Sequence, residues 1–272
     1  MSGPLLVTDR GPVRVLTLNR PQVCNAVDDA LADAIASALA QLDDDSALRV
    51  GIITGTPPGF CAGMDLKAFA RGERARIPGR GFAGLTRHPP RKPLIAAIEG
   101  FAVAGGLEIA LACDLIVTAC DATLGLPEPG LGIVAAAGGL LRLPARIPYH
   151  LATEMLLTGQ PIDGARAAEI GLASRATEPG EALAAALELA ARIASNSPAA
   201  IEVSKRLLPL ATAHPNEEVW RAHDALAMPA LESADAHEGA TAFAEHRPPA
   251  WRATSSNAGE LHDLQPAKDQ EQ

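Results

Sequence analysis

The chain has 272 residues, of which 48% are hydrophobic and 20% charged, a composition that favours a folded globular protein and excludes fibrous and largely disordered classes. Its 23 Lys and Arg residues against 32 Asp and Glu residues give a net charge of −9, which disfavours nucleic acids and anionic membranes as partners. The four cysteines form neither a CxxC pair nor a zinc-ligand pattern, so we expect reduced thiols and no metal site. The N-terminal residues carry no export-signal pattern, and we expect a cytoplasmic protein without a membrane span.

The N-terminal part of the chain alternates predicted strands and helices. Val13–Leu18 is short and β-branched and ends at Asn19-Arg20-Pro21, which predicts a strand followed by a turn. Apolar residues at spacings of three and four over residues 28–42 predict an amphipathic helix. A second strand is predicted over residues 49–54, and this order indicates a parallel crossover unit.

The densest basic stretch of the sequence follows the second strand and contains Arg71, Arg74, Arg76 and Arg80. These arginines lie among glycines, which favours a mobile loop. We therefore interpret the stretch as a solvent-exposed loop rather than a nucleic-acid site.

The same alternation then recurs. A strand is predicted over Leu94–Ile98 and a helix over Gly105–Ala112. A further strand is predicted over Leu115–Thr118 and a short extended piece over Thr123–Leu126. The core is therefore expected to be α/β.

The C-terminal part is rich in Ala and Leu. Helices are predicted over residues 165–170, 181–195, 198–210 and 217–231. We divide the chain into a core of residues 1–196, a helical oligomerisation region of residues 197–252 and a polar, disordered tail of residues 253–272.

Three segments carry residues of chemical interest, and each has an ordinary structural explanation. Residues 60–67, FCAGMDLK, form a Gly turn with a capping Asp. Residues 99–108, EGFAVAGGLE, place two glycines between a strand and a helix, where free backbone N–H groups favour negative charge, although they also suit a packing turn. In residues 126–133, LPEPGLGI, a lone Glu between prolines is typical of a surface loop.

In this order and spacing, the three segments resemble the crotonase (enoyl-CoA hydratase/isomerase) superfamily. The resemblance extends from Asn19 to about Asn196, and more weakly through the helical tail. It is supported by Asn25 after the first turn, by KPLIAAI at residues 92–98, and by Gly138-Gly139 before RLP at residues 142–144. The resemblance implies a spiral of βαβ units, two nearly perpendicular sheets wrapped by helices, and C-terminal helices that form a homotrimer or a dimer of trimers.

The resemblance also implies a shared chemistry, in which two backbone N–H groups stabilise the enolate of a coenzyme A thioester. By motif position these donors belong to Met64 and Gly105. The acid/base residues are then Glu108 and Glu128. Glu108 lies one helical turn after Gly105 and so on the same face. Their individual roles stay open, and our provisional assignment is that Glu108 orients water while Glu128 exchanges the C2 proton.

Further substrate contacts are implied around these residues. Ala62, Asp65 and Leu66 flank the first donor, and Lys67 would meet the anionic part of CoA unless it is simply solvated. The backbone of Gln22, Val23 and Cys24 would contact the adenine end. Phe243 would line the CoA site of its own or a neighbouring subunit.

The expected reaction is the reversible syn addition of water to a trans-2-enoyl-CoA thioester, with no metal or other cofactor. Ala135-Ala136-Ala137 replaces the Pro-Gly-Ala of many family hydratases, and Met64 replaces a common Ala, so the acyl pocket is in doubt. Residues 126–144 look somewhat like carnitinyl-CoA dehydratases. The alternatives are therefore a carnitinyl-CoA dehydratase, an isomerase that relies on Glu128 alone, or a non-catalytic acyl-CoA- or RNA-binding protein.

Overall fold

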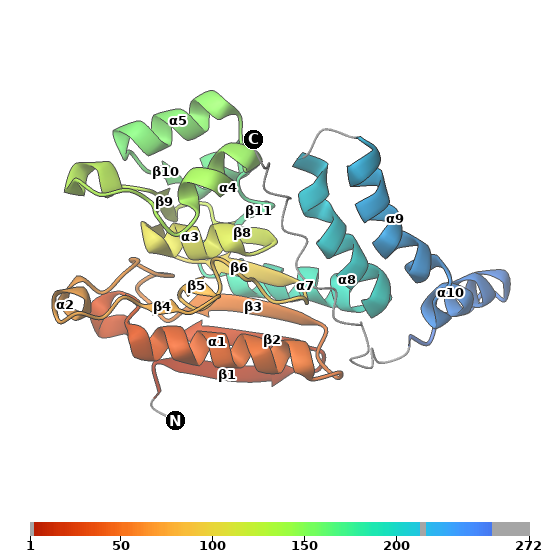
Figure 1. The fold of residues 1–272 in the computed structure, drawn as a ribbon. Helices are drawn as coiled ribbons and strands as arrows, with labels where there is room; N and C mark the ends of the chain where they lie inside the picture. The colour runs from red at the N-terminus through yellow and green to blue at the C-terminus, as the bar shows by residue number, and fades with distance from the viewer. Residues whose placement is uncertain (1–2, 213–215, 252–272) are drawn as a thin grey trace.

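A sheet of six strands forms the centre of the computed structural model, which describes residues 3–212 and 216–251 (Figure 1). The order is β1-β2-β3-β6-β8-β11, with β1 antiparallel to β2 and every other pair parallel. The strands span Leu5–Arg10 (β1), Val13–Leu18 (β2), Val50–Gly55 (β3), Leu94–Ile98 (β6), Leu115–Ala119 (β8) and Arg175–Thr177 (β11). The α/β core expected from the sequence is confirmed.

Helices cover both faces of this sheet, which explains why its inner strands are apolar on both sides. On one face, Ile53 packs in a cluster with residues of α1 (Asp29–Asp44) and α3 (Gly105–Ala112). On the other, Ile52 packs in a second cluster with the small side chains of α7 (Ala182–Ala194). Adjacent residues of one strand thus face opposite helix layers, as the two-residue period of a strand requires.

Two smaller sheets position the loops that carry the candidate site. The three-stranded sheet has the order β10-β9-β7, formed by Ile162–Asp163 (β10), Thr123–Gly125 (β9) and Phe101–Val103 (β7). Strand β7 leads directly into α3, and β9 precedes the 3-10 helix η2 (Glu128–Leu131). The hairpin of β4 (Arg76–Ile77) and β5 (Gly81–Phe82) forms the other sheet.

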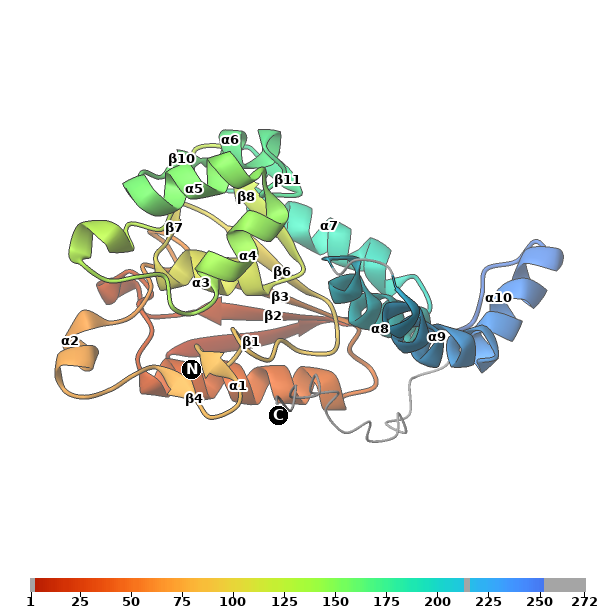
Figure 2. The same ribbon diagram turned by 45° about the horizontal axis from the view of Figure 1, so that its top comes forward.

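The last helices extend away from the sheet (Figure 2). They are α8 (Pro198–Leu207), the 3-10 helix η3 (Leu208–Thr212), α9 (Glu217–Leu231) and α10 (Ala234–Ala244). The Ser197 hydroxyl donates to the Asp235 carboxylate over 2.6 Å and so links the start of α8 to α10. The other helices are η1 (Pro21–Val23), α2 (Leu66–Ala70), α4 (Gly139–Arg146), α5 (Tyr149–Thr158) and α6 (Gly164–Glu169).

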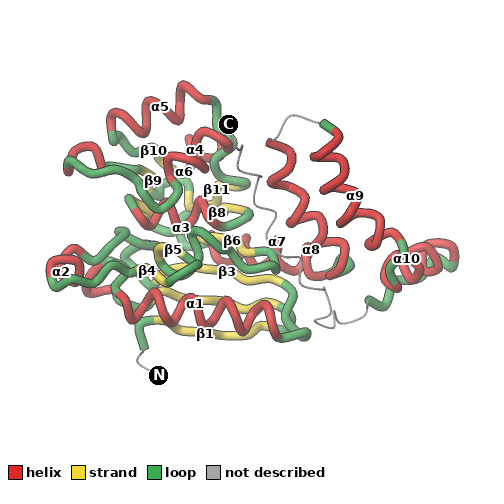
Figure 3. Tube along the Cα trace, in the orientation of Figure 1, coloured by secondary structure: helices red, strands yellow, loops and turns green. Residues whose placement is uncertain are grey.

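The sequence predicted only part of these elements, and the short strands β4, β5, β7, β10 and β11 have no counterpart among the predicted ones. The bounds predicted for β2, β6, α3 and α9 are confirmed, and the predicted helix 198–210 ends earlier, at Leu207, before a 3-10 turn. Strand β1 and helices α4, α5 and α10 were not predicted (Figure 3). The tail of residues 253–272 lies outside the described residues. No helix in the described ranges is long and apolar enough to cross a membrane.

Candidate active site

A cavity of about 280 Å³ lies where α2, the start of α3 and η2 come together, and we call it the active-site cavity. Six of the residues that the sequence assigned to the active site line it: Ala62, Met64, Leu66, Gly105, Glu108 and Glu128. The fold thus brings together three segments that are far apart in the chain. Parallel bridges between Cys61 and Ala102 and between β7 and β9 hold these segments side by side.

Glu108 is buried on α3, with 4% of the residue exposed. Its Oε1 accepts hydrogen bonds from the backbone N–H groups of Ala137, over 2.7 Å, and Gly139, over 2.9 Å. Burial raises the pKa of Glu108 and the charge of Glu128 adds to this, whereas the two N–H groups and the charge of Arg76 act in the opposite direction. The Ala-rich segment that departs from the family pattern therefore holds this carboxyl in place.

Glu128 is also 4% exposed, so the surface-loop interpretation of its Pro-Glu-Pro context does not apply. It is the first residue of η2, and its Oε2 is buried without a hydrogen-bond partner in the described part of the chain. Burial raises the pKa of Glu128, which favours the protonated form. Glu128 also lines the active-site cavity, and a carboxyl whose protonated form is favoured by burial is suited to exchange a proton with a molecule bound there.

The backbone N–H groups of Met64 and Gly105 both belong to residues that line the cavity. Neither donates to another residue in the ranges that the structure describes. Gly63, at φ +94°, packs so closely that a Cβ there would lie 2.8 Å from the Gly105 nitrogen. The two segments therefore meet closely enough to place both donors at one cavity, as an oxyanion hole requires.

Ala104 is a feature of this site that the sequence did not indicate. It precedes α3 with φ +51° and ψ −129°, a conformation that non-glycine residues rarely adopt. Such strain costs of the order of 1–3 kcal/mol and is concentrated at functional positions. No local pattern distinguishes Ala104 from an ordinary helix-preceding residue.

Asp65 has a structural role in this chain. Its Oδ1 accepts from the N–H groups of Lys67 and Ala68 and so caps α2. Its Oδ2 pairs with Arg20 over 3.0 Å, and Arg20 also pairs with Asp28 over 2.9 Å. Both oxygens of the Asp65 carboxylate thus have partners within the protein, and these contacts stabilise the loop that contains Met64.

The residues assigned to coenzyme A lie outside the cavity. Gln22 and Cys24 are exposed at η1, and the Cys24 carbonyl accepts from the N–H of Ala62 over 3.0 Å, so this turn adjoins the Met64 loop. Val23 is half-buried between them, and Lys67 is exposed. Phe243 is 83% exposed on α10 and is not among the residues that line the cavity of its own chain. Helix α10 lies at the opposite end of the molecule from α2 (Figure 1).

In the basic stretch Arg71, Arg74 and Arg76 are exposed, as the sequence indicated, but its backbone is also bonded to the core. The N–H groups of Arg74 and Ala75 donate to Asp29 at the start of α1, over 3.1 and 2.7 Å. The Arg74 guanidinium stacks 4.5 Å from the centre of the Phe69 ring. Arg74 and Arg76 both line the active-site cavity, and Arg76 pairs with Phe82 in the β4–β5 hairpin.

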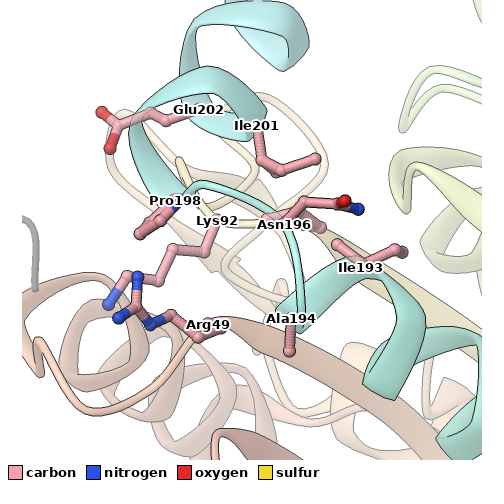
Figure 4. Close-up of a pocket in the computed structure, with 9 residues that line it drawn as sticks. Arg49, Lys92, Ile193, Ala194, Asn196, Pro198, Ile201 and Glu202 are labelled. Atoms are coloured by element: carbon pink, nitrogen blue, oxygen red, sulfur yellow. The ribbon is translucent and has the colours of Figure 1, made fainter. Parts of the chain in front are cut away.

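Another cavity, between Arg49, Lys92 and α8, offers no comparable site (Figure 4). Its volume of about 20 Å³ has room for a single water molecule. The Lys92 ammonium already donates to the carbonyls of Leu42 and Asp45. Within the described ranges, no group of His, Cys, Asp or Glu residues could hold a metal ion.

Comparisons with known proteins agree with this geometry. The model of the enoyl-CoA hydratase/isomerase family matches residues 9–254. A carnitinyl-CoA dehydratase from Proteus mirabilis (strain HI4320) is 41% identical over 260 residues, covering 93% of this chain and 99% of that protein. The structure of an enoyl-CoA hydratase from Mycobacterium marinum is 48% identical, with a TM-score of 0.90 over 92% of this chain and 99% of its own. A carnitinyl-CoA hydratase from Mycobacterium avium is 39% identical, with a TM-score of 0.74 over 93% of this chain and 100% of its own.

Proposed function

The chain belongs to the enoyl-CoA hydratase/isomerase family and has its crotonase fold, and from this we propose that it adds water reversibly to the double bond of a trans-2-enoyl-CoA thioester. One observation carries the proposal. Two buried carboxyls, Glu108 and Glu128, line the same cavity as the N–H groups of Met64 and Gly105. Such a set of groups can stabilise an enolate and move protons at the adjacent carbons.

In the proposed reaction, the thioester carbonyl oxygen accepts hydrogen bonds from Met64 and Gly105. These bonds strengthen as negative charge develops on that oxygen, and each is worth about 2.7–4 kcal/mol of barrier lowering. The start of α3 adds its positive dipole end at Gly105. Substrate carbons C2 and C3 then lie beside the two glutamates.

We assign the two carboxyls different roles because their surroundings differ. Glu108, held by two N–H donors, orients a water molecule and takes its proton as the water oxygen bonds to C3. Burial raises the pKa of both carboxyls, but Glu128 lacks the two backbone N–H donors that favour the charged form of Glu108, and it therefore gives its proton to C2. After the addition Glu108 is protonated and Glu128 is ionised. Return of that proton from Glu108 to Glu128 restores the starting state, so atoms and charges balance over the cycle.

Two other reactions on the same cavity compete with this proposal. The identity to the Proteus protein favours dehydration of a carnitinyl-CoA-like thioester, which is the same chemistry in reverse on another acyl group. Isomerisation of a double bond needs only one carboxyl and would leave Glu108 without a chemical task. A non-catalytic acyl-CoA- or RNA-binding role would leave both buried carboxyls without one.

A panel of CoA thioesters separates these functions. We expect trans-2-enoyl-CoA thioesters to gain one water molecule, seen by mass spectrometry and by loss of the conjugated enoyl absorbance. Conversion of 3-enoyl-CoA to 2-enoyl-CoA without hydration would favour the isomerase. Turnover of carnitinyl-CoA alone would favour the dehydratase.

A further inference from the structure

A second cavity, of about 410 Å³, adjoins the active-site cavity, and we call it the adjoining cavity. The two share Arg76, Phe82, Ala136 and Ala137 as walls. Since Ala137 also donates its N–H to Glu108, the shared wall begins at the catalytic carboxyl. The adjoining cavity therefore lies beside the space that an acyl group at Glu108 would occupy.

The adjoining cavity is basic. Arg76, Arg87 and Arg142 line it, and none of the described residues that line it is acidic. The Arg142 guanidinium donates to the Thr86 carbonyl over 2.5 Å. The guanidinium groups of Arg76 and Arg87 make no hydrogen bond or ion pair with any residue in the described ranges. Both residues are exposed, and the charge of Arg76 also acts on Glu108. In a chain of net charge −9, two guanidinium groups without a hydrogen-bond partner at one cavity still form a local site for an anion.

Thr86 adds a polar group that lacks a partner. The residue is 2% exposed and lines the adjoining cavity, and its Oγ1 has no hydrogen-bond partner in the described structure. Leaving a buried hydroxyl unpaired destabilises the folded state. Rotation of the Thr86 side chain would bring this buried hydroxyl to the cavity, where a bound carboxylate would accept its hydrogen bond.

The arginines stand on an ordered part of the chain. Asp29 holds the N–H groups of Arg74 and Ala75, directly before Arg76. After the hairpin, the N–H of Arg87 donates to the Arg80 carbonyl over 2.8 Å. These hydrogen bonds fix the backbone positions from which the Arg76 and Arg87 side chains extend. Less conformational entropy is therefore lost when the two side chains bind a charged group.

We propose that the adjoining cavity receives the far end of the acyl group and selects CoA thioesters whose acyl chain ends in a carboxylate. This inference rests on the proposed hydratase function, because it assumes that the reacting carbons lie beside Glu108 and Glu128. None of the residues assigned to coenzyme A lines the adjoining cavity, and binding of a matched acyl-CoA pair distinguishes an acyl carboxylate from a CoA phosphate as the anion. The same charges disfavour a quaternary ammonium in this position, and therefore a carnitinyl group.

The test compares two trans-2-enoyl-CoA thioesters of equal chain length, one ending in a carboxylate and the other in a methyl group. For the wild-type protein we expect kcat/KM to be about tenfold or more higher for the carboxylated thioester, as expected for one charge-assisted hydrogen bond. Arg87→Met removes a cation that lines only the adjoining cavity, and it should reduce this preference about tenfold. Arg80→Met removes the same charge from the same loop but lines neither cavity, and it should leave the preference unchanged.

Binding of the corresponding saturated acyl-CoA pair, measured by calorimetry, needs no turnover. A preference for the carboxylated ligand that Arg87→Met abolishes supports the inference even if no hydration is found, so failure of the proposed reaction is distinguishable. Equal binding of both ligands by the wild-type protein would overturn it. The inference would also be overturned if the Arg87→Met variant, shown by circular dichroism to be folded, bound both ligands more weakly by the same factor. The arginine would then act on the CoA moiety.

Discussion

Glu128 combines near-complete burial with an unpartnered oxygen, whereas Glu108 is equally buried but fixed by two backbone donors. The difference gives the two carboxyls different tasks in one cavity. Replacing either by Gln keeps the shape of the side chain and removes only proton transfer. We expect Glu108→Gln and Glu128→Gln each to lower kcat by about 10²–10⁴-fold while acyl-CoA binding stays nearly intact. Wild-type turnover by Glu108→Gln on every active substrate would contradict the two-carboxyl mechanism.

Glu128 should also make folding stability depend on pH. Its pKa is raised in the folded protein, so the stability present at acidic pH is lost as the pH rises through that raised pKa. Glu128→Gln carries no charge to bury, and its Tm should exceed that of the wild-type protein at neutral pH. At a pH below the ordinary pKa of a carboxyl group, the difference in Tm between the variant and the wild-type protein should disappear. A variant that melts below the wild type at neutral pH but not at acidic pH would show that Glu128 is stabilised as a carboxylate, and would contradict the prediction.

Met64 tests the backbone origin of the oxyanion hole. Met64→Ala keeps the N–H and should preserve most of the activity while changing the preferred acyl group. Met64→Pro removes the N–H and should cost at least the 2.7–4 kcal/mol, roughly, that one donor contributes. Both variants need circular dichroism spectra of a folded protein. Equal inactivity of the two would mean that the Met64 side chain itself is required.

At the scale of single elements, α3 depends on close backbone contact with the loop that precedes α2. A Cβ at Gly106 would lie 2.1 Å from the carbonyl oxygen of Cys61, which is backbone and cannot rotate away. Gly106→Ala should therefore separate the Met64 loop from α3, lower the stability by about 1–3 kcal/mol or more and abolish turnover. Gly130→Ala is the matched control, because no atom lies within 4 Å of a Cβ there. Thermal melts and activity assays of both variants check this, and an active, stable Gly106→Ala protein would contradict it.

Sequence patterns predicted the elements whose apolar spacing is regular, such as β6 and α3. They missed α4, whose helical pattern is interrupted by Pro144, and β1, an edge strand that is exposed over most of its length. The site was predictable as far as it rests on motifs, namely Met64, Gly105, Glu108 and Glu128. Arg76 was not, because its place at the cavity depends on the pairing of β4 with β5 and on Asp29, contacts between residues distant in the chain.

The whole molecule presents helices with uncovered apolar side chains. Large apolar residues of the C-terminal helices are exposed, among them Leu208, Trp220, Met228 and Leu231. We expect a homotrimer or a dimer of trimers that buries these side chains, and Phe243 would then meet a neighbouring subunit. Light scattering on the intact chain checks this, and a monomer would contradict it. A chain that ends near Arg252 should assemble in the same way.

The proposed hydration is tested most directly by incubating the protein with a trans-2-enoyl-CoA thioester in water enriched in the heavy oxygen isotope. We predict a 3-hydroxyacyl-CoA that carries one oxygen from the solvent, formed by the wild-type protein and nearly absent with Glu108→Gln or Glu128→Gln. The proposed function would be contradicted if the protein bound these thioesters but incorporated no labelled oxygen into any of them.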